Sequence, residues 1–137
     1  MKHVRMFEFV DNKSKIYLAG GWGKFRDIVI RDTNAIWLNP ETMTNRDHWF
    51  ESETDAIKEC DGMIAWFEKG NASGFGMTYE MGMAFALNKP YLLVIEDSEM
   101  LKYKFSMQSA GAEETFSNWE DALKYINDTN WMKIKKQ

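Results

Sequence analysis

The sequence predicts an α/β sandwich around a four- or five-stranded, mainly parallel sheet. Short apolar runs of strand length alternate along the chain with longer segments of helical pattern, which is typical of a sheet covered by helices. The clearest example is residues 62–96, where two apolar runs flank a glycine-rich loop and a helical segment. A strand, a helix and a second strand of this size form a right-handed crossover between parallel strands.

The composition indicates a single domain, which we expect to occupy residues 1–137 with a core at about 15–126. A chain of 137 residues can bury a sizeable core. Its formal charge of −4, without a basic stripe, argues against nucleic acid as a partner. The sequence contains neither an apolar run of membrane-spanning length nor a secretory signal, and Cys60 is its only cysteine. We therefore expect a cytoplasmic protein without a membrane partner.

The first part of the chain is expected to supply three strands. Residues 2–10 alternate crudely and precede a cluster of turn formers, which is typical of an extra edge strand at the N-terminus. Residues 15–19 form the first convincing buried strand. This strand ends in the glycine-rich run 20–23, where the backbone can approach a ligand closely. Residues 35–38 form the next strand.

Two helices are predicted in the same half of the chain. Residues 25–31 favour a short helix, although three consecutive β-branched residues weaken the pattern. Residues 46–59 have the pattern of a longer helix that ends beside Cys60, which we interpret as an inert packing thiol. The apolar set predicted for this helix is Trp49, Phe50, Ala56 and Ile57.

The central unit comprises strands at residues 62–67 and 91–96 and a helix at residues 77–88, which Pro90 cannot continue. Glu80 is expected in the first turn of this helix. Ligands of α/β proteins bind where such a loop leaves the carboxyl end of a strand and enters a helix. The residues expected to pack from this helix are Met81, Ala84, Phe85 and Leu87.

The last third of the chain has weaker patterns. Residues 97–111 are expected to be irregular, and residues 114–116 to form a last short strand. Ser117 and the glutamate three residues later have the spacing of a capping box, which predicts a helix over residues 118–126. The polar C-terminal tail, residues 127–137, is expected to fray unless it docks on the domain.

Three loops are expected to meet at the carboxyl edge of the sheet, at residues 20–26, 39–41 and 71–80. Within them, Glu80 is the strongest catalytic candidate. A carboxylate near a helix N-terminus is favoured in its ionised form, and an ionised carboxylate can attack the anomeric carbon of a sugar. The alternative interpretation is an acidic residue that only complements the helix dipole.

Several other residues leave two interpretations open. Ser73 and the glycines after it can cradle an anion with backbone N–H groups, or they can form a flexible connection. Glu53 can serve as a second acid or as a solvated surface charge, and Trp22 can stack on a base or pack in the core. The chain has no P-loop and no dinucleotide fingerprint, and its histidines lack metal-ligand spacing. We therefore expect neither a metal nor a dinucleotide.

Three segments of the chain are KIYLAGGW, ECDGMIAWFE and SGFGMTYEMGMAFALNKPYLLVIED, and the third contains G-x-x-x-E-x-G-x-A-x-x-x-x-K at residues 76–89. In order and spacing they resemble the nucleoside 2-deoxyribosyltransferase family, over roughly residues 15–126. The resemblance implies a flavodoxin-like, three-layer sandwich and cleavage of an N-glycosidic bond without a cofactor. It also implies a small-molecule nucleoside or nucleotide as substrate, and a homo-oligomer whose sites are completed across an interface.

The resemblance assigns roles to individual residues. Glu80 matches the glutamate that attacks the anomeric carbon, after which the sugar passes to another base or to water. Tyr17 matches a tyrosine that helps to position that glutamate, and Glu53 falls where the family has an aspartate. The implied substrate-binding residues are Gly21, Trp22, Arg26, Asn39, Glu41, Ser73, Gly74, Gly76 and Met107.

The chain departs from the family pattern at two places. Gly74 stands where the transferases have an aspartate that handles the base. Related deoxynucleoside 5′-monophosphate N-glycosidases have a phosphate-binding serine there, which Ser73 matches with a one-residue shift. Met107 matches a methionine that enters the neighbouring subunit's site, but Phe105 stands where the family has an asparagine. The general acid therefore stays open between Glu53 and Glu41.

The leading hypothesis is an enzyme that cleaves the N-glycosidic bond of a (deoxy)nucleoside or nucleotide through Glu80, as a transferase or a hydrolase. The first alternative is a non-catalytic nucleotide-binding or sensing module on the same fold. The second is a structural α/β domain whose loops carry no function. The presence of Glu80 within its full motif favours the enzyme.

Overall fold

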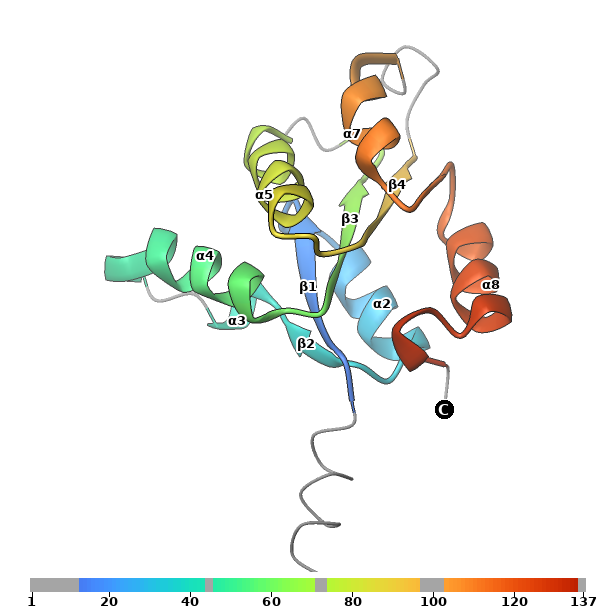
Figure 1. Cartoon of the computed structure of the whole chain (residues 1–137), viewed down its shortest axis with the longest axis horizontal. Helices are drawn as coiled ribbons and strands as arrows, with labels where there is room; N and C mark the ends of the chain where they lie inside the picture. Colours follow the sequence, from blue (N-terminus) through green and yellow to red (C-terminus); the bar gives the residue numbers. More distant parts are fainter. Residues whose placement is uncertain (1–12, 44–45, 71–73, 97–102, 136–137) are drawn as a thin grey trace, which may run out of the picture.

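In the part of the chain that the structure describes, five parallel strands form one sheet in the order β2-β1-β3-β4-β5 (Figure 1). The computed structural model describes residues 13–43, 46–70, 74–96 and 103–135. The strands are β1 (Lys15–Gly20), β2 (Ile36–Leu38), β3 (Gly62–Phe67), β4 (Tyr91–Ile95) and β5 (Glu114–Phe116). The predicted α/β architecture with a parallel sheet is confirmed. The extra strand predicted at residues 2–10 lies outside the described residues.

Helices cover both faces of the sheet (Figure 1). On one face lie α4 (Trp49–Glu59), α5 (Phe75–Ala86) and α7 (Ser106–Gly111). On the other lie α2 (Phe25–Asp32), α8 (Trp119–Thr129) and the 3₁₀ turn η2 (Trp131–Lys133). The short helix α3 (Pro40–Met43) and the 3₁₀ turn η1 (Arg46–His48) connect β2 to α4. No described helix has the length and apolar character that a membrane crossing requires.

Side chains alternate between the two cores along each strand. Tyr17 and Ala19 of β1 pack on the α4–α5 side, whereas Ile16 and Leu18 pack on the α2–α8 side. All six residues of β3 are buried, as expected of a central parallel strand covered on both faces. This alternation aims Tyr17 at the helix that carries Glu80.

The strand order reverses between β1 and β3. From β1 the chain crosses to β2 on one side, and from β3 it crosses to β4 on the other. Loops that leave the carboxyl ends of β1 and β3 therefore diverge and leave a crevice between them, which is the usual ligand site of open α/β sheets. The loop after β1 and the loop after β3 are two of the three predicted to supply the site.

Several predictions about helices need correction. The helix predicted at residues 46–59 begins with the 3₁₀ turn η1, and the exposed fractions of Trp49 and Phe50 are 55% and 47%. These two rings are outside the core because α4 projects beyond the edge of the short strand β2 (Figure 1). Helix α5 spans Phe75–Ala86, so it starts and ends two residues earlier than predicted. Phe85 on this helix and Leu87, its C-cap residue, are exposed.

The C-terminal part is more ordered than predicted. Part of the segment predicted as irregular forms α7. Asn118, not Ser117, caps α8, because its side-chain oxygen accepts the Asp121 N–H at 2.8 Å, and the helix continues to Thr129. The tail docks: Trp131 and Ile134 are buried, so the core extends beyond residue 126.

Candidate active site

Two cavities adjoin: one of about 270 Å³ lies between α4 and α5, and one of about 380 Å³ lies beside the loop after β1. Glu53, Gly76 and Glu80 line both cavities. The smaller is otherwise lined by apolar and aromatic residues, namely Trp49, Phe50, Thr54, Ile57 and Tyr79. The larger is lined by loop residues and polar groups, namely Gly20, Gly21, Trp22, Arg26, Pro40, Gly74 and Met77. Glu80 thus lies where an aromatic compartment meets a polar one.

Glu80 is held by Tyr17. The fully buried Tyr17 donates its hydroxyl hydrogen to Glu80 Oε2 across the interface of β1 and α5. Glu80 is the sixth residue of α5 and lies in its second turn, so the predicted first-turn position is wrong. Its carboxylate is fixed by a side chain of the sheet.

Burial, with a smaller contribution from the nearby Glu53 charge, raises the pKa of Glu80 to about 7. The Tyr17 hydrogen bond and the Arg26 charge act in the opposite direction and lower this pKa. The expected preference for the ionised form, argued from the helix N-terminus, is therefore wrong. Desolvation outweighs the helix dipole because the carboxyl group lies one turn inside the helix. Burial and Glu80 together also raise the pKa of Tyr17, which keeps that hydroxyl a donor.

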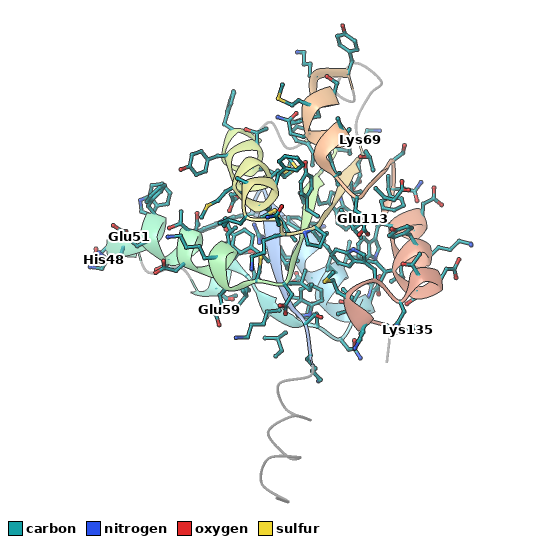
Figure 2. All side chains as sticks on the ribbon, in the orientation of Figure 1. His48, Glu51, Glu59, Lys69, Glu113 and Lys135 are labelled. Atoms are coloured by element: carbon teal, nitrogen blue, oxygen red, sulfur yellow. The ribbon has the colours of Figure 1, made fainter. Side chains whose placement is uncertain are left out.

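Glu53 approaches Glu80 from α4. It is half-buried and lines both cavities, whereas Asp55, two residues later, is exposed. Glu51, on the same helix, lies at the far end of α4 (Figure 2). The sequence pattern favoured a solvated charge at position 53, but the packing of α4 against α5 brings it to the site. The structure thus places two carboxylates around one crevice.

Arg26 is a structural member of the site. Its guanidinium is 2% exposed, and it donates from Nη1 to the Leu18 carbonyl at 2.9 Å and to Asn39 Oδ1 at 3.0 Å. Nη2 donates to the Gly20 carbonyl at 3.0 Å, and Nε lies 3.7 Å from Glu41 Oε2. Arg26 thus links the end of β1 to Asn39, the first residue after β2. The Asn39 side chain helps to hold these two loops together. Burial lowers the pKa of Arg26, which the surrounding acids partly offset.

Two glycines of the site differ in the space beside them: Gly76 is open, whereas Gly74 is closely packed. A Cβ added to Gly76 would meet no atom within 4 Å, so the space beside this residue is open. A Cβ on Gly74 would lie 2.9 Å from the Phe67 ring, so the loop passes close to the sheet there. Trp22 is 65% exposed and lines the polar cavity, which excludes the interpretation that it packs in the core. Ser73 lies outside the described residues.

Met107 is not part of the Glu80 site of its own chain. It is 82% exposed on α7 and lines a separate groove of about 430 Å³ between α5 and α7. Sequence reasoning missed the aromatic compartment, because Trp49 and Phe50 were assigned to the core and Tyr79 to no role. The Phe50 and Tyr79 ring centroids lie 6.3 Å apart across α4 and α5. Among the described residues, no group of three His, Cys, Asp or Glu side chains has the arrangement of a metal site.

Known proteins share this architecture. The sequence model for nucleoside 2-deoxyribosyltransferase matches residues 29–116. Among solved structures, a 2-deoxyribosyltransferase from Bacillus psychrosaccharolyticus has a TM-score of 0.69 at 22% identity, covering 90% of this chain and 99% of that one. A CMP N-glycosidase from Clostridium botulinum has a TM-score of 0.54 at 19% identity, covering 84% and 98%. No sequence in the curated set matches the chain.

The two structural similarities support the fold, and the family match supports the assignment independently. The matched residues 29–116 include β2 to β5, both carboxylates of the crevice and the whole of α5. The Gly76-to-Lys89 pattern, on which the resemblance in sequence depends, lies inside this range. The chain belongs to the nucleoside 2-deoxyribosyltransferase family of enzymes.

Proposed function

We propose that this enzyme cleaves the N-glycosidic bond of a (deoxy)nucleoside or nucleotide, with Glu80 as the nucleophile. The observation that carries the proposal is the position of the Glu80 carboxylate, oriented by Tyr17, at the junction of the aromatic and polar cavities. A nucleoside has the same two-part character, since a flat base is joined to a polar sugar. The bond to be broken lies between these two parts.

The aromatic cavity suits the base. The exposed rings of Trp49, Phe50 and Tyr79 offer faces and edges on which a planar heterocycle can pack. The polar cavity, with its glycine backbone and Glu53, suits the hydroxyl groups of the sugar. In this arrangement the anomeric carbon faces Glu80.

The reaction then follows from the two carboxylates. The ionised Glu80 carboxylate forms a bond to the anomeric carbon, and the bond to the base nitrogen breaks with its electron pair leaving on the base. Glu53, which lines both cavities, supplies the proton that the departing base needs. The glycosyl-enzyme ester is resolved by a second base, which gives transfer, or by water, which gives hydrolysis.

Incubation of the purified chain with a panel of deoxynucleosides and their 5′-monophosphates tests the proposal. Each substrate is run with and without a second free base, and the products are separated by chromatography. Glu80→Gln should lower turnover by roughly a thousandfold or more, because it removes the nucleophile. Glu51→Gln, at the far end of α4, is the matched control and should retain wild-type activity (Figure 2).

The panel also separates the finer alternatives. Formation of a new nucleoside that requires the second base establishes transfer, and release of free base without exchange establishes hydrolysis. If Ser73 holds a phosphate, Ser73→Ala should weaken the binding of monophosphates more than that of nucleosides. A panel that stays intact with wild-type protein would favour the non-catalytic binding module instead.

We also propose that the enzyme is a homo-oligomer whose copies meet at α5 and α7. The exposed side of α5 includes Phe75, Tyr79 and Phe85, and Glu80, the single charged residue of this helix, faces the crevice. Met107 continues this uncharged apolar surface onto α7. A second copy offers a surface of the same character. Its binding would also bring a neighbouring Met107 towards the aromatic cavity beside Tyr79.

A further inference from the structure

Glu68, the first residue after β3, lies in neither cavity, yet it contacts the loop that carries Trp22. Its Oε1 accepts the backbone N–H of Phe25, the first residue of α2, at 3.0 Å. Lys24, at the N-cap position of α2, makes no capping hydrogen bond with its own side chain. Glu68 therefore supplies the negative cap that this helix lacks locally.

The carboxylate is also packed against Gly23. A Cβ added there would lie 2.2 Å from Glu68 Oε1 and 2.6 Å from Glu68 Cδ. Any side chain at position 23 would therefore displace the Glu68 carboxylate. Gly23 is thus required for the close approach of the two segments. The contact joins the loop after β1 to the start of the loop after β3.

The loop between β1 and α2 is consequently held at both ends. At its start, Arg26 Nη2 binds the Gly20 carbonyl at 3.0 Å, and at its end Glu68 binds the Phe25 N–H. Between these two anchors lies Trp22, whose ring is exposed and lines the polar cavity. The anchors fix the path of the loop, while the ring itself remains available to a ligand.

We propose that Glu68 is a positioning residue, which holds the Gly21–Trp22 wall of the active site by capping α2. This inference rests on the proposed function, because it gives Trp22 a substrate to contact. Glu68 does not touch the reacting atoms in this arrangement. Its removal should therefore weaken substrate binding and leave the chemical step at Glu80 nearly intact.

The kinetic test compares Glu68→Ala and Glu68→Gln with wild type on the substrate that the panel identifies. Glu68→Ala should raise KM about tenfold while kcat changes less than about threefold. This pattern is expected when a variant binds the substrate and the transition state more weakly by the same amount. Glu68→Gln should recover most of the affinity, because its amide oxygen can still accept the Phe25 N–H. Glu113→Ala, a carboxylate remote from the crevice that accepts the Tyr125 hydroxyl, is the control and should leave both constants unchanged. A fall in kcat with unchanged KM would overturn the proposal.

A second measurement needs no activity. Hydrogen exchange of the backbone amides of residues 20–25 should accelerate in Glu68→Ala and in Gly23→Ala, whose new Cβ expels the carboxylate. The double variant should exchange no faster than either single variant, because both remove the same contact. Unchanged exchange in Glu68→Ala overturns the anchor whatever the activity shows. If exchange accelerates in the two variants as predicted but the wild-type protein turns over no substrate, the proposed function fails and the anchor stands.

Discussion

Glu80 shows how far a buried carboxylate can depart from the behaviour that its position in a helix suggests. Its surroundings raise its pKa to about 7, so at neutral pH the acid and the carboxylate are both populated. Tyr17 and Arg26 favour the ionised form, whereas burial and Glu53 oppose it. A nucleophile must be ionised, so these neighbours set the pH at which the enzyme can work.

The pKa of Glu80 should appear in the pH dependence of the activity. In wild type, kcat/KM should fall as the pH is lowered through about 7, because protonation removes the nucleophile. Tyr17→Phe removes a hydrogen bond that lowers the Glu80 pKa, so the acidic limb should move to higher pH. Glu53→Gln removes the proposed proton donor and should lower the rate. It also removes a negative charge that raises the Glu80 pKa, so the acidic limb of its residual activity should move to lower pH. The measurement is a pH profile of kcat/KM for the three proteins.

Glu51→Gln is the control for these profiles, because Glu51 is on α4 but lines neither cavity. Its acidic limb should coincide with that of wild type. Identical limbs for wild type, Tyr17→Phe and Glu53→Gln would mean that the titrating group is not Glu80. In that case a different residue would have to carry the acidic limb.

For single residues, the sequence predicted which side chains meet at the site better than it predicted their ionisation. The resemblance to the family paired Tyr17 with Glu80, and the structure joins them by a hydrogen bond because Tyr17 faces the layer that contains α5. The ionisation of Glu80 could not be predicted, since it depends on how deeply α5 buries the carboxylate and on Glu53 from another helix. The aromatic compartment was missed because Trp49 and Phe50 look like core residues in a helical pattern.

At the scale of elements, the sheet was easier to predict than the helices. The predicted bounds of β3 and β5 match those of the structure, because short apolar runs between turn formers leave few alternatives. Helix α7 has no apolar periodicity, and none of its residues is buried, so its sequence carried no helical signal. Helix α5 is apolar on all sides, and its pattern could not tell which side faces the sheet.

The exposed side of α5 predicts how copies of the chain associate. Phe85 is 63% exposed and lines the groove between α5 and α7. If a second copy covers this surface, Phe85→Lys places a charge in an apolar interface and should convert the oligomer to monomer. Light scattering coupled to size exclusion measures the mass. Ile30→Lys is a matched control on α2, in the opposite layer, and should leave the mass unchanged. A wild-type protein that is monomeric would refute the interface.

At the scale of the whole molecule, the site and the fold make opposing demands on Glu80. The sheet and α5 bury a carboxyl group that must be ionised for the reaction that we propose, and an ionised buried carboxylate destabilises the folded state. The rest of the molecule offsets this cost through two hydrophobic cores, one on each face of the sheet. Their residues extend from β1 to the docked tail at Ile134, so the stability that supports the site comes from nearly the whole described chain.

This conflict predicts a pH-dependent gain of stability in Glu80→Gln. The folded pKa of about 7 lies above the ordinary value of 4.5, so the unfolded chain loses the Glu80 proton first as pH rises. Below pH 4.5 the group is protonated in both states and contributes no difference. Between 4.5 and 7 the folded state loses stability progressively, and above 7 the full cost is present. The difference between the two pKa values corresponds to about 3 kcal/mol at most.

Urea unfolding of wild type and Glu80→Gln at pH 4 and pH 8 measures this cost. The glutamine is nearly isosteric and uncharged, so its free energy of unfolding should exceed that of wild type by about 1–3 kcal/mol at pH 8 and by little at pH 4. Glu51→Gln should show no such difference at either pH, because its carboxylate is exposed. An equal effect of Glu80→Gln at both pH values would mean that packing, not charge, distinguishes the variant. Loss of turnover together with a gain of stability confined to high pH would identify Glu80 as a carboxylate that the fold keeps for its reactivity.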